Sequence, residues 1–461
     1  MRRGGRFDSL LCMSKSFRAW DVDQAWLLPA SVHEFLPPGH LAHFVRDTVR
    51  EGLDLSAIMG VYKTAQGQPA YHPGMLVALL LYGYSRGIYS SRQLARACEE
   101  RVDMMAVTGL NRPDFRTISD FRKRHLAALS HLFVQVLRLC QASGLVKLGH
   151  VAVDGTKLRA NASKHKAMSY QRMVQQEPRL AAEVASWLDR AEAADAVEDA
   201  EHGAARRGDE TPAWMADKQR RLERIRAAKA QLEAEAKAGP GGTDPDGPGP
   251  SSGMQERGGR SDKPAQMPPE KTPPAKAQRN FTDGDCRIMP SGGGFIAGYN
   301  GQIAVDAAHQ IIIAQQLGTN PADYAGLIPL VDQARANLGR KPREVSADTG
   351  FATEANHAAM AQRRIAAYLA PGRIRHGKTD PAAGRVLKRK PLMQAMADTI
   401  RRAGRRTRYR LRKQVVEPVF GHIKQARGFR QFLLRGLTNV RAEWAIICTV
   451  HNLLKLHRAA A

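Results

Sequence analysis

Three acidic residues lie beside apolar segments, where an ionised carboxylate requires a compensating partner. Asp154 and Asp348 each follow a short apolar run, and Glu417 opens the amphipathic stretch VVEPVFGHIK. An ionised carboxylate at the edge of an apolar core is costly unless it is paired, hydrogen-bonded or bound to a cation. Asp and Glu oxygens suit hard ions such as Mg²⁺ or Mn²⁺, and no His or Cys cluster competes with them. Convergence of the three acids would hold two Mg²⁺ ions, which activate a water or hydroxyl for attack on a phosphodiester.

Each acid also has a structural interpretation. Asp154 and Asp348 fit strand-end caps, and Glu417 in a first helical turn complements the helix dipole. Other acids are rival ligands: Asp306 follows a strand but lies in a hairpin turn, where Asp is common, and Asp283 and Asp285 in FTDGDCRIM remain open. His422 and His451 lie on apolar helices, so we expect packed or hydrogen-bonded histidines there.

The overall charge points to a polyanionic partner. The chain has 461 residues, a formal net charge of +26 and a pI near 10.3. Lysine and arginine placed on phosphates release condensed counterions, so nucleic acid is the leading partner and an acidic membrane surface the second. The five cysteines are far apart, which predicts neither a zinc site nor a disulfide framework.

Half of this excess charge lies in one run. Residues 373–413 hold 15 Lys or Arg and two acids, a net of +13 immediately before the helix predicted at residues 414–426. A solvated surface is the ordinary interpretation of such a run, but its density favours phosphate binding. The candidate DNA-binding residues are Arg405, Arg406, Arg408, Arg410, Arg412, Lys413 and Lys424, with Arg122, Lys123 and Arg124 earlier in the chain.

The N-terminal part reads as helical. Residues 40–49, 73–85, 91–100 and 117–140 carry apolar side chains at three- and four-residue spacing. The helices at 91–100 and 117–140 either form a helix-turn-helix that lays Arg122, Lys123 and Arg124 on DNA, or belong to an all-helical domain with a solvated basic face. The sequence leaves both interpretations open.

A mixed sheet is predicted for the rest. A strand ends at Asp154, residues 299–305 and 310–316 form a hairpin, residues 343–347 and 365–369 are strands, and residues 323–338, 353–364 and 440–456 are helices. Between the first strand and the hairpin, residues 163–238 suit an exposed helical hairpin, and residues 239–279 are dense in Gly, Pro, Ser and Lys and are expected to be disordered. That insertion is a poor place to seek chemistry.

No segment suits a membrane or a secretory signal. The longest core-like apolar run is far shorter than the roughly 20 residues that a spanning helix needs, so no transmembrane helix is predicted. The widely separated cysteines fit a reducing compartment, and a cytoplasmic, nucleoid-associated location is expected. Met13 is an alternative start, with residues 1–12 as translated upstream sequence.

Four stretches of the sequence resemble a known protein family. The stretches AVDGTKLRANAS, GYNGQIAVDAAHQIIIA, SADTGFATEAN and VEPVFGHIKQARGFRQFLLRGLTNVRAEWAIICTVHNLLKL resemble the DDE transposases of bacterial insertion sequences. The resemblance implies an α/β fold with a ribonuclease H-like mixed sheet flanked by helices, an all-α N-terminal domain, and a helical then disordered insertion. The implied division is a tail at 1–25, a helical domain at 26–144, a catalytic domain at 145–162 and 281–461, and an insertion at 163–280.

The same resemblance implies a site and partners. Asp154, Asp348 and Glu417 would be the catalytic metal ligands for two Mg²⁺ ions, with Mn²⁺ as a substitute. The partners would be the element's inverted repeats and target DNA, in an active complex that is a homodimer or larger. This chain departs from the family's tyrosine-arginine-glutamate-lysine signature, because Lys413 replaces the arginine and Tyr409 lies one position early. Thr349 also follows Asp348 where a small residue is more usual.

Three functions remain open from the sequence. The first is a transposase that binds element ends, hydrolyses the phosphodiester there and joins the 3′-hydroxyl to target DNA. The second is a catalytically silent DNA-binding protein derived from a transposase, and the third is a metal-dependent nuclease of the same fold without strand transfer.

Overall fold

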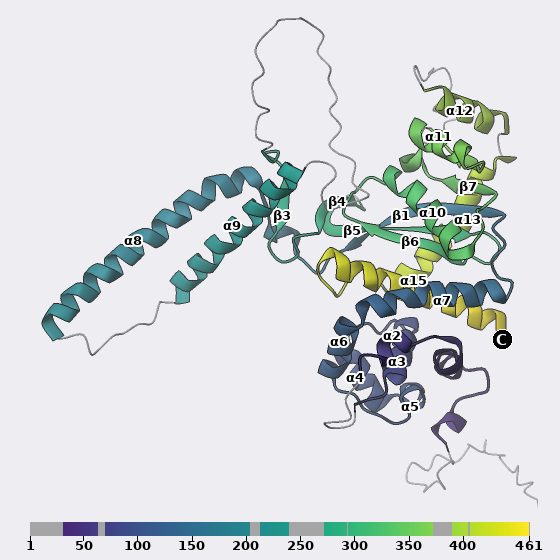
Figure 1. Cartoon of the computed structure of the whole chain (residues 1–461), viewed down its shortest axis with the longest axis horizontal. Helices are drawn as coiled ribbons and strands as arrows, with labels where there is room; N and C mark the ends of the chain where they lie inside the picture. The colour runs from purple at the N-terminus through teal and green to yellow at the C-terminus, as the bar shows by residue number, and fades with distance from the viewer. Residues whose placement is uncertain are drawn as a thin grey trace, which may run out of the picture.

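Figure 1 shows a mixed sheet with helices around it, a cluster of N-terminal helices below it, and a long helical hairpin that projects to one side. The computed structural model describes residues 31–62, 70–202, 213–238, 272–292, 294–371, 390–403 and 406–460. No helix in these ranges is long and apolar enough to cross a membrane.

The central strand is β1 (His150–Arg159). It pairs antiparallel with β5 (Gly294–Asp306) on one side and parallel with β7 (Glu344–Ala347) on the other, and β7 pairs parallel with β8 (Ala366–Leu369). The other edge of β5 carries β4 (Arg287–Ser291) and then β6 (Ile312–Gly318), both antiparallel. This order, with the predicted hairpin as β5 and β6, confirms the α/β, ribonuclease H-like interpretation.

Helices cover both faces of the sheet. A Cβ built on Gly301 of β5 would meet Trp444 of α15 (Leu437–Ala460), whereas the Cβ of Gly326, just before α10 (Leu327–Leu338), would meet Gln302. Because neighbouring residues of a strand face opposite sides, α15 and the start of α10 lie on opposite faces. The remaining helical elements of the C-terminal part are η5 (Tyr324–Gly326), η6 (Thr349–Phe351), α11 (Glu354–Gln362), α12 (Pro391–Ala403), η8 (Arg408–Arg410), α13 (Leu411–Val415), α14 (Glu417–Gly421) and the π-helix η9 (His422–Ala426).

The N-terminal helices join the same core. The helix α7 (Leu126–Ala142) packs along α15, as Figure 1 shows, and one continuous cluster of buried apolar side chains runs from Ala42 to Leu456. Tyr89 ties the two parts together, because its hydroxyl donates to the carbonyl of Arg427 at 2.8 Å. The remaining N-terminal elements are η1 (Val32–Phe35), α1 (Leu41–Asp47), the π-helix η2 (Thr48–Gly52), α2 (Ser56–Met59), α3 (Pro73–Ser85), α4 (Ser91–Glu100), α5 (Val102–Thr108) and α6 (Phe115–Arg124).

Two helical predictions need correction. The helix expected at 117–140 is two helices, α6 and α7, which meet at His125. The break expected before it contains α5, so α4 and α6 are not consecutive helices of a helix-turn-helix. Asp114 caps α6, because its carboxylate accepts the backbone N–H groups of Arg116 and Thr117.

The insertion is a helical hairpin, as expected. Its helices α8 (Tyr170–His202) and α9 (Ala213–Ala238) pack together through small apolar clusters, one around Ile225 and one around Leu222. At its base, η3 (Lys164–Lys166) leads into β2 (Ala167–Ser169), which pairs antiparallel with β3 (Gln278–Asn280). The disorder expected at 239–279 falls outside the described residues for 239–271, and the end of that segment, in β3, is ordered.

Candidate active site

Two of the three predicted acids are neighbours across the sheet. The parallel pairing of β1 with β7 ends at the pair Val153 and Ala347, so Asp154 and Asp348 are the next residues of the two strands. The expectation that Asp154 ends its strand was wrong, since β1 continues to Arg159 along β5. Asp154 and Asp348 are nevertheless neighbours, as expected, because their proximity depends only on the parallel pairing of β1 with β7.

The surroundings of Asp154 oppose its negative charge. Burial raises the pKa of Asp154 to about 7, and the nearby carboxylates of Asp348 and Asp323 raise it too, against the backbone N–H of Gly155 and the positive charge of Arg412. Gly155 donates that hydrogen bond at 2.8 Å. A carboxylate in this position is stabilised by a bound cation, since a cation compensates both the lost hydration and the like charges.

One carboxylate oxygen of Asp348 accepts a hydrogen bond from the backbone two residues later. It caps η6, where Oδ1 accepts the backbone N–H of Gly350 at 2.8 Å. A Cβ on Gly350 would lie 3.0 Å from that same oxygen. The glycine therefore leaves the space beside the carboxylate open.

The segment from η8 to η9 brings positive charge to the acids. Arg412 lowers the pKa of Asp154 and lies over the ring of Tyr409, with the guanidinium carbon 5.1 Å from the ring centre. Lys424 donates to the Thr156 hydroxyl and, at 3.1 Å, to the carbonyl of Lys157, both on β1. The signature arginine position falls on Lys413 in the sequence, and this side chain is exposed. The neighbouring Arg412 is the residue whose positive charge acts on Asp154.

Glu417 lies between Arg412 and Lys424 in the sequence, but it does not join Asp154 and Asp348 in a three-residue metal-binding cluster. It is exposed, and it opens α14 seven residues before Lys424, which lies in the π-helix η9. Within the described ranges, no three His, Cys, Asp or Glu side chains are close enough to hold a metal ion together. The structure therefore brings together Asp154 and Asp348, with Glu417 on the adjoining helix.

These residues fit a hard divalent cation. Asp154 and Asp348 supply oxygen donors, and the raised pKa of Asp154 shows a carboxylate that lacks charge compensation. The described cysteines are all buried and none lies among these donors. The donor set excludes a soft thiolate site and suits Mg²⁺ or Mn²⁺.

Asp323 is a fourth acid that sequence analysis missed. Its Oδ1 accepts from Lys157 Nζ at 3.0 Å, Asn300 Nδ2 at 2.6 Å and Gln302 Nε2 at 3.0 Å. It also lies against Gly155, where a Cβ would come within 2.6 Å of it. Asp323 therefore packs directly behind the residue that follows Asp154. In the sequence Asp323 follows TNPA, a turn-like stretch with no apolar periodicity, which does not predict its location. In the structure, the pairing of β5 with β6 brings Asp323 beside Asn300 and Gln302 of β5.

The rival acids have structural roles elsewhere. Asp306 pairs with Val151 at the other end of β1, is 1% exposed, and accepts the backbone N–H groups of Lys147 and Leu148 at 3.2 and 2.6 Å. Asp283 accepts the Tyr299 hydroxyl at 2.8 Å, and Asp285 accepts the N–H of Leu437 at the start of α15. These contacts explain each acid without a metal.

The two histidines are packed, as expected. Their rings meet edge to face with centres 5.6 Å apart, and His451 Nε2 lies 2.9 Å from the carbonyl oxygen of Gln310. Burial lowers the pKa of His422 to about 4 and that of His451 well below its usual value, with Arg427 adding to both shifts. Neutral, enclosed imidazoles of this kind contribute to packing.

The predicted DNA contacts separate into buried and exposed groups. Arg122 is 6% exposed and donates to the Tyr84 hydroxyl at 2.9 Å and to the Tyr89 carbonyl at 3.1 Å, so it is a core residue and not a phosphate contact. Arg408 pairs with Glu344 at 2.6 Å. Lys123, Arg124, Arg406, Arg410 and Lys413 are exposed, and Arg405 lies outside the described residues.

Two transposase family models match this chain. The family described as "Transposase domain (DUF772)" matches residues 30–124, and the family described as "Transposase DDE domain" matches residues 269–453. Together the two matches cover more than half of the chain. The second includes Asp348 and Glu417, while β1 with Asp154 precedes it. Searches of curated proteins and of solved structures gave no significant match.

Proposed function

We propose that this chain, which belongs to the DDE transposases of insertion sequences, cuts DNA at the ends of its element and joins the freed end to target DNA in a divalent-metal-dependent reaction. The observation that carries the proposal is the register of β1 and β7, which makes Asp154 and Asp348 neighbours. Two neighbouring, half-buried carboxylates in a chain of net charge +26 are suited to holding cations beside DNA.

In this proposal Asp154, Asp348 and Glu417 hold two Mg²⁺ ions. When bound, such ions lower the pKa of a water or hydroxyl and stabilise the leaving oxygen of a phosphodiester. The chain's own contribution is to fix the donors: the sheet sets Asp154, and the cap on η6 sets Asp348. Glu417, the first residue of α14, would supply the third carboxylate.

The basic residues of the same segment orient the DNA. Arg412 and Lys424 bring positive charge to the strand that carries Asp154, close to where a scissile phosphate would bind. Burial lowers the pKa of Lys424, and Arg430 and Lys157 add to that shift by repulsion. A phosphate placed between these cations relieves the repulsion, so DNA binding and the charge pattern of the site favour each other. The exposed Arg406, Arg410 and Lys413 extend this surface.

A defined reaction tests the proposal. Purified protein is incubated with Mg²⁺, a DNA carrying the inverted repeats that flank its reading frame, and a supercoiled target plasmid. The proposal expects cleavage at the repeat ends and joined products that disappear on chelation with EDTA. End binding without any cleavage would identify a silent DNA-binding protein, and cleavage without joined products would identify a nuclease.

A further inference from the structure

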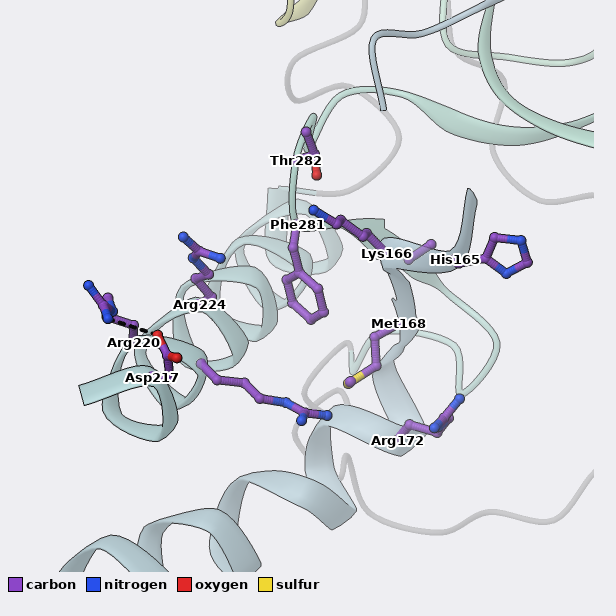
Figure 2. Close-up of a pocket in the computed structure, with 11 residues that line it drawn as sticks. His165, Lys166, Met168, Arg172, Asp217, Arg220, Arg224, Phe281 and Thr282 are labelled. Atoms are coloured by element: carbon purple, nitrogen blue, oxygen red, sulfur yellow. Dashed lines mark hydrogen bonds and ion pairs between the residues drawn. The ribbon is translucent and has the colours of Figure 1, made fainter. Parts of the chain in front are cut away.

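A second basic site lies at the base of the inserted hairpin, away from the acids. A cavity of about 670 Å³ lies between η3, the start of α8, and α9; Figure 2 shows the residues that line it. Its floor is apolar, formed by the buried Met168 and the half-buried Phe281. Its rim is cationic, with the exposed side chains of Lys166, Arg172, Arg220, Arg221 and Arg224 against one acid, Asp217.

The cations of α9 fall into two groups. Those that face α8 are neutralised: Lys218 pairs with Glu183 at 2.9 Å, and Lys229 and Arg226 pair with Glu177 at 2.8 and 3.3 Å. Those that line the cavity are only partly neutralised. Arg220 pairs with the exposed Asp217 at 2.8 Å, whereas Arg221 reaches only the neutral Gln176, at 3.4 Å. Arg224 forms no ion pair with any residue in the described part of the chain.

The arginines of α9 that line the cavity form a row. Arg220 and Arg224 are one helical turn apart, and Arg221 lies beside them, so their Cβ atoms are about 5–6 Å from one another. Lys166 and Arg172 face this row across the cavity. Several exposed cations at this spacing suit a polyanion with closely spaced charges better than a single small anion.

The cavity is fixed relative to the catalytic sheet. Arg279 of β3 is 8% exposed and pairs with Glu235 of α9 at 2.5 Å and with Asp285 at 3.9 Å. Asp285 in turn accepts the N–H of Leu437 at the start of α15 at 2.8 Å. This chain of contacts links the base of the hairpin to the helix that covers the sheet.

We propose that this cavity, which we call the hairpin cleft, binds the phosphate backbone of the same duplex that is cut at Asp154. The proposal rests on the function proposed above and adds a DNA contact within the insertion, which sequence analysis set aside. Asp154 and Lys166 are twelve positions apart in the sequence, a stretch that spans at most about 43 Å when fully extended. At roughly 3.4 Å per base pair, Lys166 lies within the length of about 13 base pairs from Asp154.

The test is the salt dependence of binding to a duplex that carries the element end. Arg221→Gln and Arg224→Gln are combined in the full-length protein, and the control combines Arg179→Gln and Arg190→Gln, which removes two positive charges from exposed positions of α8 outside the cleft. The slope of log K against log[salt] should fall by about 0.9 for each phosphate that the protein no longer neutralises, hence by up to about 1.8 in the cleft variant. The control should keep the wild-type slope.

Duplex length gives the second arm. A duplex that extends beyond this limit of about 13 base pairs from the cleaved bond should distinguish the wild-type protein from the cleft variant, and stepwise shortening of the duplex toward the cleaved bond should remove that difference. Equal slopes for the wild type and the cleft variant would overturn the proposal, as would an equally reduced slope in the control. Displacement of the long duplex by inorganic phosphate alone, or tighter binding to anionic vesicles than to DNA, would also overturn it. If the wild-type protein neither binds nor cuts DNA, the proposed function fails; if it cuts normally and the slopes are equal, only the cleft assignment fails.

Discussion

Substitution of Gly155 by alanine tests whether the polar cluster behind Asp154 is as tightly packed as the structure shows. The new Cβ would lie 2.6 Å from Asp323 Oδ1 and 3.2 Å from Asn300 Oδ1. Asp323 cannot easily give way, since Lys157, Asn300 and Gln302 all donate to that oxygen. One of the two elements must therefore shift.

The expected effect follows from two opposing contributions. Overpacking a tight site costs about 1–3 kcal/mol, and the loss of glycine's freedom in the unfolded chain returns about 0.4–1 kcal/mol. We expect Gly155→Ala to lower the free energy of unfolding by about 1–2 kcal/mol, measured as a shift of the urea midpoint by circular dichroism. Because Gly155 also donates to Asp154 Oδ1 at 2.8 Å, cleavage should fall further, by roughly 100-fold for a displacement near 1 Å.

A matched control is available just before the same strand. Gly149 immediately precedes β1, and a Cβ there would meet nothing within 4 Å, so Gly149→Ala should leave stability unchanged or raise it by up to about 1 kcal/mol. Combining Gly155→Ala with Asp323→Ala should give a loss of stability smaller than the sum of the single losses, by about 0.5–3 kcal/mol. Strict additivity, or a Gly155→Ala protein as stable and active as the Gly149→Ala protein, would refute the close packing of Asp323 against β1.

Two further predictions concern stability and the insertion. The low pKa values of His422 and His451 mean that the unfolded chain takes up protons first as the pH falls, so the stability they contribute is complete above about pH 6.5 and is lost on acidification. Calorimetry should show a loss of about 1–2 kcal/mol from His422 between pH 7 and 5, and His422→Gln should reduce that pH dependence; an identical pH profile would contradict it. Replacing residues 239–271 by a short Gly/Ser linker should leave Mg²⁺-dependent nicking within about tenfold, because Glu235 pairs with Arg279 and so holds the two ends of the segment close together. Complete loss of nicking in a folded protein would show that the segment takes part in the active complex.

The sequence predicted what depends on strand pairing and periodicity. Asp154 and Asp348 could be placed together because apolar runs mark β1 and β7, and parallel neighbours bring equivalent ends together. The continuation of β1 past Asp154 could not be predicted, because Thr156 and Lys157 are polar and their partners, Lys424 and Asp323, are more than 160 residues away.

Charged side chains in the core were the other source of error. Arg122 ends α6 in a basic triplet that is typical of a solvated face, and only the packing of α6 near Tyr84 and Tyr89 shows that its guanidinium is buried. The choice between Arg412 and Lys413 had the same difficulty. It depends on the turn at Val416 between α13 and α14, which no residue periodicity marks.

The central claim is that Asp154, Asp348 and Glu417 act as one metal-binding unit. The most direct measurement compares Mg²⁺-dependent cleavage of the element end by Asp154→Asn, Asp348→Asn, Glu417→Gln and the triple variant. Each single variant should cleave at background while it still binds the DNA, and the triple variant should lose no more, because groups that act as a unit are not additive.

Two controls separate this result from unfolding. Asp154→Asn removes a charge that burial opposes, so without metal it should melt no lower than the wild type. Asp306→Asn, at the other end of β1, should retain cleavage in protein that is confirmed to be folded. Full cleavage by any of the three single variants, or an inactive folded Asp306→Asn beside an active Asp348→Asn, would contradict the assignment of these acids as the metal ligands.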